Sequence, residues 1–524
     1  MNGNKFSKLL NRVFHILFLF CFSAVFLVIL LTGFESEKLG YSTKERIFVI
    51  IGFIVLLLIV TGVYIFIQRY NTAPKLRVKK QFTDKHIKIA IFSVIGIMLI
   101  IQLTMGYLLQ MEPVTDMTYL NRYSIDFAKT GSFDLIQQDC QKGSVYLIRY
   151  PNNFAIVFFL SFIYRIGYLL FGYIPTWLPI VFNVFAINIS VLLTVFTARK
   201  LFGNRQALFV LFMCFFFAPY YTYVPYYYTD SLSMPFCVAS IYLFVCAVKS
   251  DTKYKKYILM ALCGVFTFIG FKFKGSIIIL LAAALIYIVL RFGIKRILCF
   301  SLALIVGFSS VSIIYSSVFN SMNIVTEKQS DEYEYPYTHW IMMGLKGLGH
   351  YNFKDSQYTA SFPTKDEKQA ANIDEIKNRI KDFGVLGLAS HIASKTKWTW
   401  EDGTYYISHH IEKPIRKNIL HEFILDQGEY HLIFYIYSCG YQLLLIFMIC
   451  ISIFKGCIKS EINLMTFLKG IVFAAFIFFI IWETRSRYLY NFTPIFILLS
   501  ADGMDYMISK LKYTKSKLIY KRHK

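Results

Sequence analysis

Two acidic residues stand beside long apolar runs, where a carboxylate can reach both a lipid-borne substrate and an acceptor in water. Asp116 follows an apolar run that ends near Leu109, and Asp230 separates the aromatic run Tyr226 to Tyr228 from the next apolar one. An ionised carboxylate within hydrogen-bond reach of a hydroxyl or an amine can act as a general base. A solvated interfacial Asp116 and a membrane-surface belt of tyrosines are the alternative interpretation. Asp230 favours a functional role, because a charge next to hydrocarbon needs a partner or a wet cavity.

Two short turns between apolar runs carry cations. Lys272 and Lys274 lie in one of them, and Arg485 and Arg487 lie in the other. Both side chains bind phosphate oxygens, and the planar fork of Arg matches them especially well. Anchors that snorkel to the membrane surface are an equally simple explanation. If these two basic turns lie at the same membrane face as the segments that contain Asp116 and Asp230, the four together form a pocket suited to an anionic lipid head group.

The elements that must hold these side chains are membrane-spanning helices. The chain has 524 residues, of which 56% are hydrophobic and 16% are charged, and its mean hydropathy is +0.51. Its apolar residues occur in runs of about 20, the length of a helix that crosses a bilayer. This composition excludes an ordinary soluble enzyme and predicts an all-α polytopic membrane protein.

The net charge of +24 and the ten Cys residues do not change this prediction. Lys and Arg cluster between the apolar runs, where they set orientation, so we expect no nucleic-acid partner. Nine of the ten Cys lie in or beside apolar runs, and only Cys140 lies in a polar loop. The spacing indicates neither a disulfide framework nor a CxxC metal site.

Basic loops predict which ends of the spans face the cytoplasm, where Lys and Arg are enriched. We expect about twelve spans in a multi-pass cell-membrane protein, with both termini in the cytoplasm and the acidic and basic turns outside. Extracytoplasmic juxtamembrane helices and one modest outer-loop domain complete the predicted fold. The segments that set this orientation are 69–88, 199–205, 249–256, 291–296, 455–459 and 510–524.

Residues 154–171 form an apolar run that this orientation does not accommodate as a span. If they crossed the membrane, the basic loop at 199–205 and every later loop would change sides. Arg165 also interrupts the run. We therefore predict that it lies against the extracytoplasmic surface or re-enters the membrane, with a full crossing as the alternative.

The chain divides into four regions by composition. The region 318–430 is the only soluble-like one, since it holds 16 of the 31 acidic residues, and a spacing of three and four between apolar residues predicts a helix near 368–394. The predicted regions are a two-span hairpin with a basic cytoplasmic loop at 1–87, a catalytic transmembrane module at 88–317 with a first outer loop at 111–176, the extracytoplasmic loop domain at 318–430, and the last spans with a basic tail at 431–524.

A series of short motifs resembles the GT-C superfamily of integral membrane glycosyltransferases. The similarity covers residues 88–510 approximately. Within the superfamily, the chain resembles the bacterial branch related to protein mannosyltransferases and aminoarabinose transferases, including its Gram-positive members. The motifs, in order, are Thr115-Asp-Met-Thr-Tyr119, Phe127-Ala-Lys-Thr-Gly131, Tyr150-Pro151, Ala198-Arg-Lys-Leu-Phe-Gly203, Thr229-Asp230, Phe273-Lys-Gly275 and Arg487-Tyr-Leu-Tyr-Asn-Phe-Thr-Pro494.

This resemblance implies roles for individual residues. Asp116 would be the catalytic base, Asp230 a second acid that positions an acceptor or a metal, and Lys274, Arg485 and Arg487 ligands of the donor phosphate. Many relatives place a second acid directly after the first, whereas this chain has Met117. No metal ligand or cofactor is therefore assigned, and a divalent metal stays an open alternative. The further substrate-binding candidates are Tyr119, Arg149, Tyr150, Lys272, His339 and Tyr488.

The same resemblance implies transfer of a hexosyl or pentosyl group from a polyprenyl-phosphate-linked sugar, with inversion. The acceptor would be an extracytoplasmic glycan, a cell-wall polymer such as teichoic acid, or a protein. We find no Gly-rich turn for a nucleotide sugar, which agrees with a lipid carrier. The segments 339–344 and 398–403 resemble outer-loop elements whose aromatic residues stack on sugars, although packing onto the membrane explains them equally well.

Three other functions compete with this one. A flippase or transporter for lipid-linked oligosaccharides has a similar number of spans, but it buries charges at mid-membrane and often has duplicated halves. A polysaccharide polymerase uses a related lipid-linked substrate and also has cations outside. A structural scaffold has no need for cations on its outer face. An Asp in the first outer loop, ahead of the Lys-Gly turn, favours the transferase.

Overall fold

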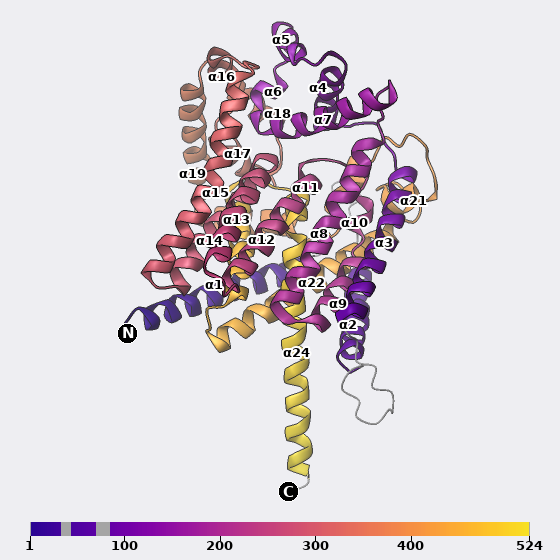
Figure 1. Ribbon diagram of the computed structural model, residues 1–524, viewed down its shortest axis with the longest axis vertical. Coiled ribbons are helices and arrows are strands. Elements are labelled where there is room, and N and C mark those ends of the chain that lie inside the picture. The colour runs from indigo at the N-terminus through magenta and orange to yellow at the C-terminus, as the bar shows by residue number, and fades with distance from the viewer. Residues whose placement is uncertain (1, 33–42, 70–83, 523–524) are drawn as a thin grey trace.

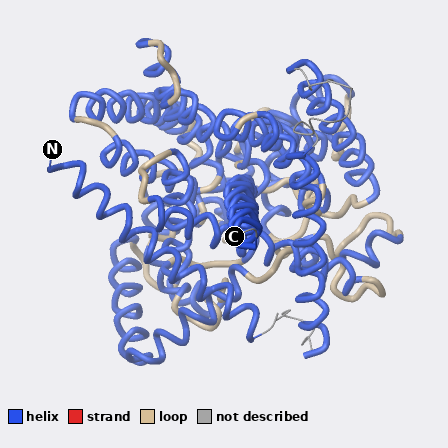
Figure 2. The backbone as a smooth tube through the Cα atoms, turned by 90° about the horizontal axis from the view of Figure 1, so that it is seen from below, coloured by secondary structure: helices blue, strands red, loops and turns tan. Residues whose placement is uncertain are grey.

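The computed structural model describes residues 2–32, 43–69 and 84–522, and these residues form helices joined by loops, without a strand (Figures 1 and 2). The predicted basic segments 69–88 and 510–524 lie partly outside this range. The described helices of the bundle are α1 (Asn2–Thr32), α2 (Thr43–Arg69), α3 (Asp84–Leu108), α8 (Leu178–Phe202), α9 (Asn204–Phe215), α12 (Met234–Val248), α13 (Lys253–Phe273), α14 (Ile278–Arg291), α15 (Ile294–Ser321), α22 (His431–Lys459), α23 (Leu464–Ile481) and α24 (Thr493–Arg522).

Ten helices of the described chain are long and apolar enough to cross a membrane, and the segment Pro151–Phe171, which contains α7, is one of them. Two shorter apolar helices, α9 and the segment Gly275–Arg291 that contains α14, add to them. A helix satisfies its own backbone hydrogen bonds, which is why apolar runs take this form in lipid. The prediction of an all-α polytopic membrane protein is confirmed.

Close packing holds the bundle together. Helices α13 and α15 cross at a pair of glycines: a Cβ on Gly264 would lie 2.1 Å from the Leu304 carbonyl oxygen, and one on Gly307 would lie 1.9 Å from that of Ala261. Small residues of this kind allow helix backbones to approach closely. Figure 2 shows α24 near the middle of the bundle, where it packs chiefly against α22.

A buried polar cluster connects α22, α23 and α24. The carboxylate of Asp502, which is 2% exposed, accepts hydrogen bonds from Ser452 Oγ at 2.6 Å and from Lys455 Nζ at 2.7 Å. Lys469 Nζ donates to the Ser452 carbonyl oxygen at 2.6 Å. Asp502 is therefore paired directly with the half-buried Lys455 of α22, and its charge also acts on the buried Lys469 of α23.

We expect Asp502→Ala to lower the free energy of unfolding by about 3 kcal/mol, because it leaves buried cations without their counter-charge. Asp502→Asn should cost less, since the amide can still accept from Ser452. Denaturant titration of the protein in detergent micelles measures both, with the exposed Asp251→Ala as the control. Equal stability of Asp502→Ala and the control would contradict this role.

One end of the bundle collects the loops that the charge pattern places outside (Figure 1). Helix α7 lies crosswise on this end. Its Phe154 ring contacts Phe319 near the end of α15 at 5.0 Å, and its Phe159 ring contacts Phe273 at the end of α13 at 5.6 Å. Contacts along its length with helix ends place α7 against this end of the bundle, and its length and apolar composition would also suit a membrane span. The helices here are α4 (Asp116–Thr130), α5 (Asp134–Gln141), α6 (Tyr146–Arg149), η1 (Pro151–Asn153), α7 (Phe154–Phe171), α10 (Pro219–Thr222), α11 (Thr229–Leu232), η2 (Gly275–Ile277) and η3 (Ser486–Phe492).

The segment 318–430 folds into short helices around one long one. The predicted helix at 368–394 lies within α19 (Lys365–Trp400), which kinks at Gly384, where φ is +57°. Glycine adopts that backbone conformation without steric cost. The other helices are α16 (Glu327–Tyr333), α17 (Thr338–Gly344), α18 (Phe353–Ala360), α20 (Ile407–His410) and α21 (Ile419–Ile424).

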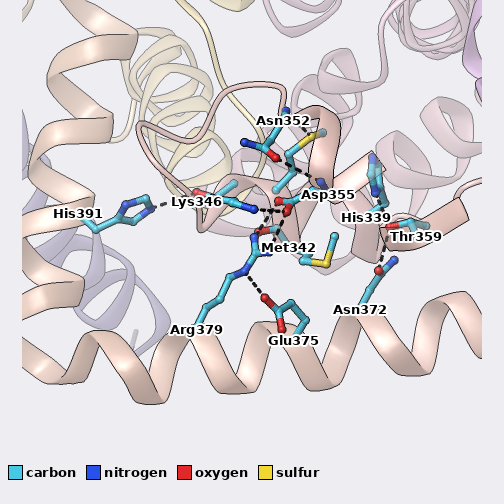
Figure 3. Close-up of polar contacts among 12 residues, drawn as sticks. His339, Met342, Lys346, Asn352, Asp355, Thr359, Asn372, Glu375, Arg379 and His391 are labelled. Atoms are coloured by element: carbon cyan, nitrogen blue, oxygen red, sulfur yellow. Dashed lines mark hydrogen bonds and ion pairs between the residues drawn. The ribbon is translucent and has the colours of Figure 1, made fainter. Parts of the chain in front are cut away.

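A buried carboxylate organises this loop domain (Figure 3). Asp355 accepts two hydrogen bonds from the Arg379 guanidinium, at 2.8 and 2.9 Å, and one from Lys346 at 2.8 Å. Burial opposes ionisation of Asp355, but the hydrogen bonds from Arg379 and Lys346 outweigh it and lower its pKa. These hydrogen bonds connect α18 to α19 and to the segment that follows α17.

Lys395 attaches this domain to the bundle. Its Nζ donates to the carbonyl oxygens of Gly344 at 2.8 Å and Ile480 at 2.9 Å, at the ends of α17 and α23. Burial lowers the pKa of Lys395 to about 7. The amine therefore fills the gap between three helices at the cost of losing part of its charge.

Stability should consequently rise between pH 7 and about pH 10, the pKa of an unfolded lysine. In that interval the unfolded chain holds a proton that the folded chain has released, so increasing pH favours folding. We expect this rise in unfolding temperature in the wild-type protein and a smaller one in Lys395→Met. Thermal unfolding followed from pH 6 to pH 10 tests it, and identical slopes would contradict it.

Candidate active site

A cavity of about 560 Å³ lies where the first outer loop, the loop domain and the segment after α23 meet. It is lined by side chains from α4, α6, α17, α20 and η3 and from the loops beside them. The sequence-predicted site residues that line it are Asp116, Tyr119, Arg149, Tyr150, Arg485, Arg487 and Tyr488.

Asp116 is the first residue of α4 and is partly exposed to the cavity. Thr115 before it has a φ of +50°, in the left-handed region that non-glycine residues rarely adopt. Strained backbone of this kind persists where the surrounding structure fixes it, often at functional sites. The N-terminus of a helix also stabilises a nearby negative charge, which suits a carboxylate at this position.

The aromatic run at 226–228 connects the acidic and basic parts of the site. Tyr228 OH donates to Asp116 Oδ2 at 3.1 Å, Tyr227 OH donates to Asn121 Oδ1 at 3.0 Å, and Tyr226 OH accepts from Arg487 Nη1 at 3.1 Å. All three side chains are buried. The tyrosines are therefore not a membrane-surface belt, and each one holds a different part of the cavity wall.

Asp230 lies behind this wall. Lys274 donates a hydrogen bond to its carboxylate, and Arg487 Nη1 lies 3.8 Å from its Oδ2 atom. Asp230 is 0% exposed, and neither it nor Lys274 lines the cavity. The carboxylate of Asp230 therefore lies beside two cations, and its Oδ2 atom has no hydrogen-bond partner among the described residues.

Arg485 and Arg487 project from the segment that follows α23. The guanidinium carbon of Arg485 lies 4.5 Å from the Tyr406 ring centre, and that of Arg487 lies 5.3 Å from the Tyr228 ring centre. Cation–π contacts hold a guanidinium without consuming its hydrogen-bond donors. Arg487 Nε is buried without a hydrogen-bond partner among the described residues. Donors of both residues are thus available to an anion in the cavity.

Glu483 and Tyr488 complete this wall. Tyr488 OH donates to Glu483 Oε1 at 3.1 Å, and Lys274 Nζ lies 4.8 Å from the Tyr488 ring centre. Burial raises the pKa of Glu483, although Arg487 and the Tyr488 hydroxyl act in the opposite direction. The second acid of the cavity is therefore harder to ionise than an exposed glutamate.

Asp402 connects the loop that contains Tyr405 and Tyr406 to the segment that contains Arg485. Its carboxylate accepts hydrogen bonds from the Tyr406 backbone N–H at 2.8 Å and from Ser486 Oγ at 2.7 Å. Tyr405 and Tyr406 both have positive φ, at +54° and +64°. The loop domain is thus tied directly to the arginine-bearing segment, and Tyr406 is turned beneath the Arg485 guanidinium.

Two neighbouring histidines also line the cavity but differ in their surroundings. His409 lies 3.0 Å from a Glu412 carboxylate oxygen, whereas His410 is buried and stacks on Tyr226 with ring centres 4.1 Å apart. Burial, followed by the nearby Arg487, lowers the pKa of His410 well below its usual value. His410 is therefore neutral at physiological pH. The sequence analysis missed it because nothing in a His-His pair reveals an arginine neighbour from another segment.

Two predicted binding residues lie away from the cavity. Lys272 Nζ lies 4.5 Å from the Tyr315 ring centre on α15, and the buried His339 shares a 2.7 Å hydrogen bond with Thr359 inside the loop domain (Figure 3). The residue after His339, Trp340, does line the cavity, and it stacks on Trp482.

The tryptophans of the segment 398–403 point into the protein. Trp398 and Trp400 are 8% and 1% exposed, and Trp400 packs on Phe22 of α1. They support the fold of the site. No group of three or more His, Cys, Asp or Glu side chains suited to a metal ion occurs among residues 2–32, 43–69 and 84–522.

Three solved structures show a low overall similarity to the chain. The archaeal oligosaccharyltransferase AglB from Archaeoglobus fulgidus, solved with an inhibitory peptide and a dolichol-phosphate, has a TM-score of 0.41 and 12% identity, with 82% of this chain covered. This chain spans about half of AglB, 51%. ArnT from Cupriavidus metallidurans with undecaprenyl phosphate has a TM-score of 0.34 and 11% identity over 80% of this chain and 78% of ArnT. Its apo form has a TM-score of 0.31 and 10% identity over the same shares.

TM-scores below 0.5 do not establish a common fold, so functional conclusions rest on the cavity itself. No curated protein matches the sequence. One family model, described as "conserved hypothetical integral membrane protein", matches residues 4–507. With nearly its whole length matched, this chain belongs to that family of integral membrane proteins.

Proposed function

We propose that this protein is a membrane glycosyltransferase that moves a sugar from a polyprenyl-phosphate carrier to an extracytoplasmic acceptor, with inversion of configuration. The observation that carries the proposal is the combination of Asp116 with Arg485 and Arg487 in one cavity at the end of a membrane bundle. A carboxylate can take a proton there, and guanidiniums can receive a lipid phosphate.

Asp116 is the proposed general base. Its carboxylate accepts the proton of an acceptor hydroxyl while that oxygen attacks the anomeric carbon from the side opposite the phosphate. The new C–O bond forms as the bond from the anomeric carbon to the phosphate oxygen breaks, which inverts the configuration. The hydrogen bond from Tyr228 orients the carboxylate toward the cavity.

Arg485 and Arg487 are the proposed ligands of the leaving phosphate. Negative charge grows on the phosphate as the bond breaks, and donors that are fixed beforehand stabilise it without reorganisation. Asp230, which is itself paired with Lys274, acts through Arg487: its carboxylate attracts the guanidinium from behind the cavity wall. Asp230 is thus proposed as a positioning residue rather than as a second acid in contact with the substrate.

Aromatic side chains provide surfaces for sugar rings. Tyr119 stacks on Tyr146 with ring centres 4.4 Å apart and is 38% exposed, so one of its faces is available. Trp340 and Tyr150 lie on the same cavity, with ring centres 6.4 Å apart. We propose a hexose or pentose as the transferred group and a cell-wall polymer, another glycan or a protein as its acceptor.

The experiment that tests this function uses purified protein reconstituted in liposomes. Radiolabelled hexoses and pentoses on polyprenyl phosphate are supplied one at a time, together with extracted envelope polymers as acceptors. We expect one donor to lose its sugar to an acceptor fraction and polyprenyl phosphate to bind. Movement of intact donor across the bilayer without transfer would identify a flippase instead, and absence of binding by every donor would refute the proposal.

A further inference from the structure

Arg149 is a second cationic site in the cavity, separate from the proposed phosphate ligands. It ends the short helix α6 and lines the cavity, and its guanidinium carbon lies 5.2 Å from the Tyr335 ring centre. Its Nε is buried without a hydrogen-bond partner in the described part of the chain. No acidic side chain in the described ranges forms an ion pair with it.

An arginine in this state is suited to an oxyanion. The edge formed by Nε and one terminal nitrogen matches two oxygens of a phosphate or carboxylate in parallel hydrogen bonds. A buried donor that lacks a partner also costs free energy, which a bound anion would recover. The ring of Tyr335 supports the guanidinium without occupying this edge.

One series of contacts connects Asp116 to Arg149, and a second series connects it to Arg487. On one side, Arg149 packs on Tyr335, whose ring centre is 5.5 Å from that of Tyr150, which in turn is 5.3 Å from that of Tyr146. Tyr146 adjoins the Asp116 carboxylate. Burial is the main reason that the pKa of Tyr146 is raised, and the negative charge of Asp116 raises it further.

On the other side, Asp116 accepts from Tyr228, and Tyr228 packs against the Arg487 guanidinium. Arg149 and Arg487 therefore line the cavity on separate aromatic supports, Tyr335 and Tyr228, and the proposed base is connected to both. In an inverting transfer the acceptor and the leaving phosphate lie on opposite sides of the sugar, so two anionic partners would need two cationic groups.

We infer that Arg149 binds an oxyanion of the acceptor, so that the natural acceptor is an anionic polymer bearing phosphodiester or carboxylate groups. This inference rests on the proposed function, because it assigns Arg485 and Arg487 to the donor. The inference narrows the class of acceptor. A cation that is separate from the donor's phosphate ligands favours an acidic glycan or a polyol phosphate over a neutral glycan.

The test measures the binding of a donor analogue and of three acceptor analogues to variants of the purified full-length protein. The donor analogue is polyprenyl phosphate. The acceptor analogues are a fluorescent glycerol-phosphate trimer, an oligogalacturonate trimer that carries carboxylates, and the uncharged maltotriose. Arg149→Gln should weaken trimer binding about 30-fold, within the range for losing hydrogen bonds to a charged group, and leave polyprenyl-phosphate binding unchanged. Arg487→Gln should weaken polyprenyl-phosphate binding and leave trimer binding unchanged. Arg416→Gln, an exposed arginine outside the cavity, is the matched control.

Each outcome has a defined meaning. Preference for the glycerol-phosphate or the galacturonate trimer identifies the anion, and loss of that preference in Arg149→Gln supports the inference. Equal binding of maltotriose, or equal weakening of polyprenyl phosphate by Arg149→Gln, overturns it while leaving the proposed function intact. If polyprenyl phosphate itself fails to bind the wild-type protein, the proposed function fails first. Raised salt should weaken the anionic trimer and not maltotriose.

Discussion

Asp116→Asn should lower sugar transfer by about 10³-fold, within the range that a positioned general base contributes. The amide has nearly the same shape as the carboxylate and can still accept the hydrogen bond of Tyr228, but it cannot take a proton from the acceptor. Binding of polyprenyl phosphate should remain close to that of the wild-type protein, because Asp116 does not contact the proposed phosphate ligands. Initial rates in liposomes and a separate binding assay measure the two effects.

The same helix provides a matched control for this substitution. Asp126 lies three turns along α4 and does not line the cavity, so Asp126→Asn should retain near wild-type transfer. A similar loss in both variants would indicate damage to α4 rather than loss of a base. Transfer retained by Asp116→Asn would remove Asp116 from the mechanism.

Arg487→Ala should weaken polyprenyl-phosphate binding by about 2 kcal/mol or more, a factor of about 30 in Kd. The guanidinium is buried in the wall of the cavity, and its loss removes donors from the phosphate and one of the two cations beside Asp230. Arg487→Lys should restore the charge but not the planar fork, so we expect only partial recovery. Equilibrium binding of labelled polyprenyl phosphate in micelles measures all three proteins.

Loss of stability must be separated from loss of binding in this variant. Asp502→Ala is the comparison, because it is expected to destabilise the bundle through a cluster on α22 to α24 that does not line the cavity. If Arg487→Ala and Asp502→Ala unfold with similar ease but only the first loses affinity, the loss belongs to the site. Wild-type affinity in Arg487→Ala would show that the phosphate lies elsewhere.

Several site residues could be predicted because their signal is local in the sequence. Asp116, Arg485 and Arg487 each interrupt an otherwise apolar neighbourhood at the edge of a run, and charge at a membrane edge is visible without any partner. In the structure these residues line one cavity, together with Trp340 from the predicted segment 339–344 and with Tyr228 and His410.

The two lysines of one turn show where this reasoning ends. Lys272 lies in the last turn of α13 and faces Tyr315, whereas Lys274 follows the helix in extended backbone and turns to Asp230. Side chains two positions apart on a helix do not share a face. Composition treats the two as equivalent, and only the end of α13 distinguishes them.

The sequence by itself determined that this is an all-α polytopic membrane protein with charged turns at one predicted face, because hydropathy, length and charge are properties of short segments. The tertiary structure decided which charges meet. Arg487 reaches Tyr226 across 261 positions of sequence, and Lys274 reaches Asp230 across 44. Such pairs depend on how helices pack against one another, and that packing places the Asp230 carboxylate beside Lys274 and Arg487, behind the cavity lining.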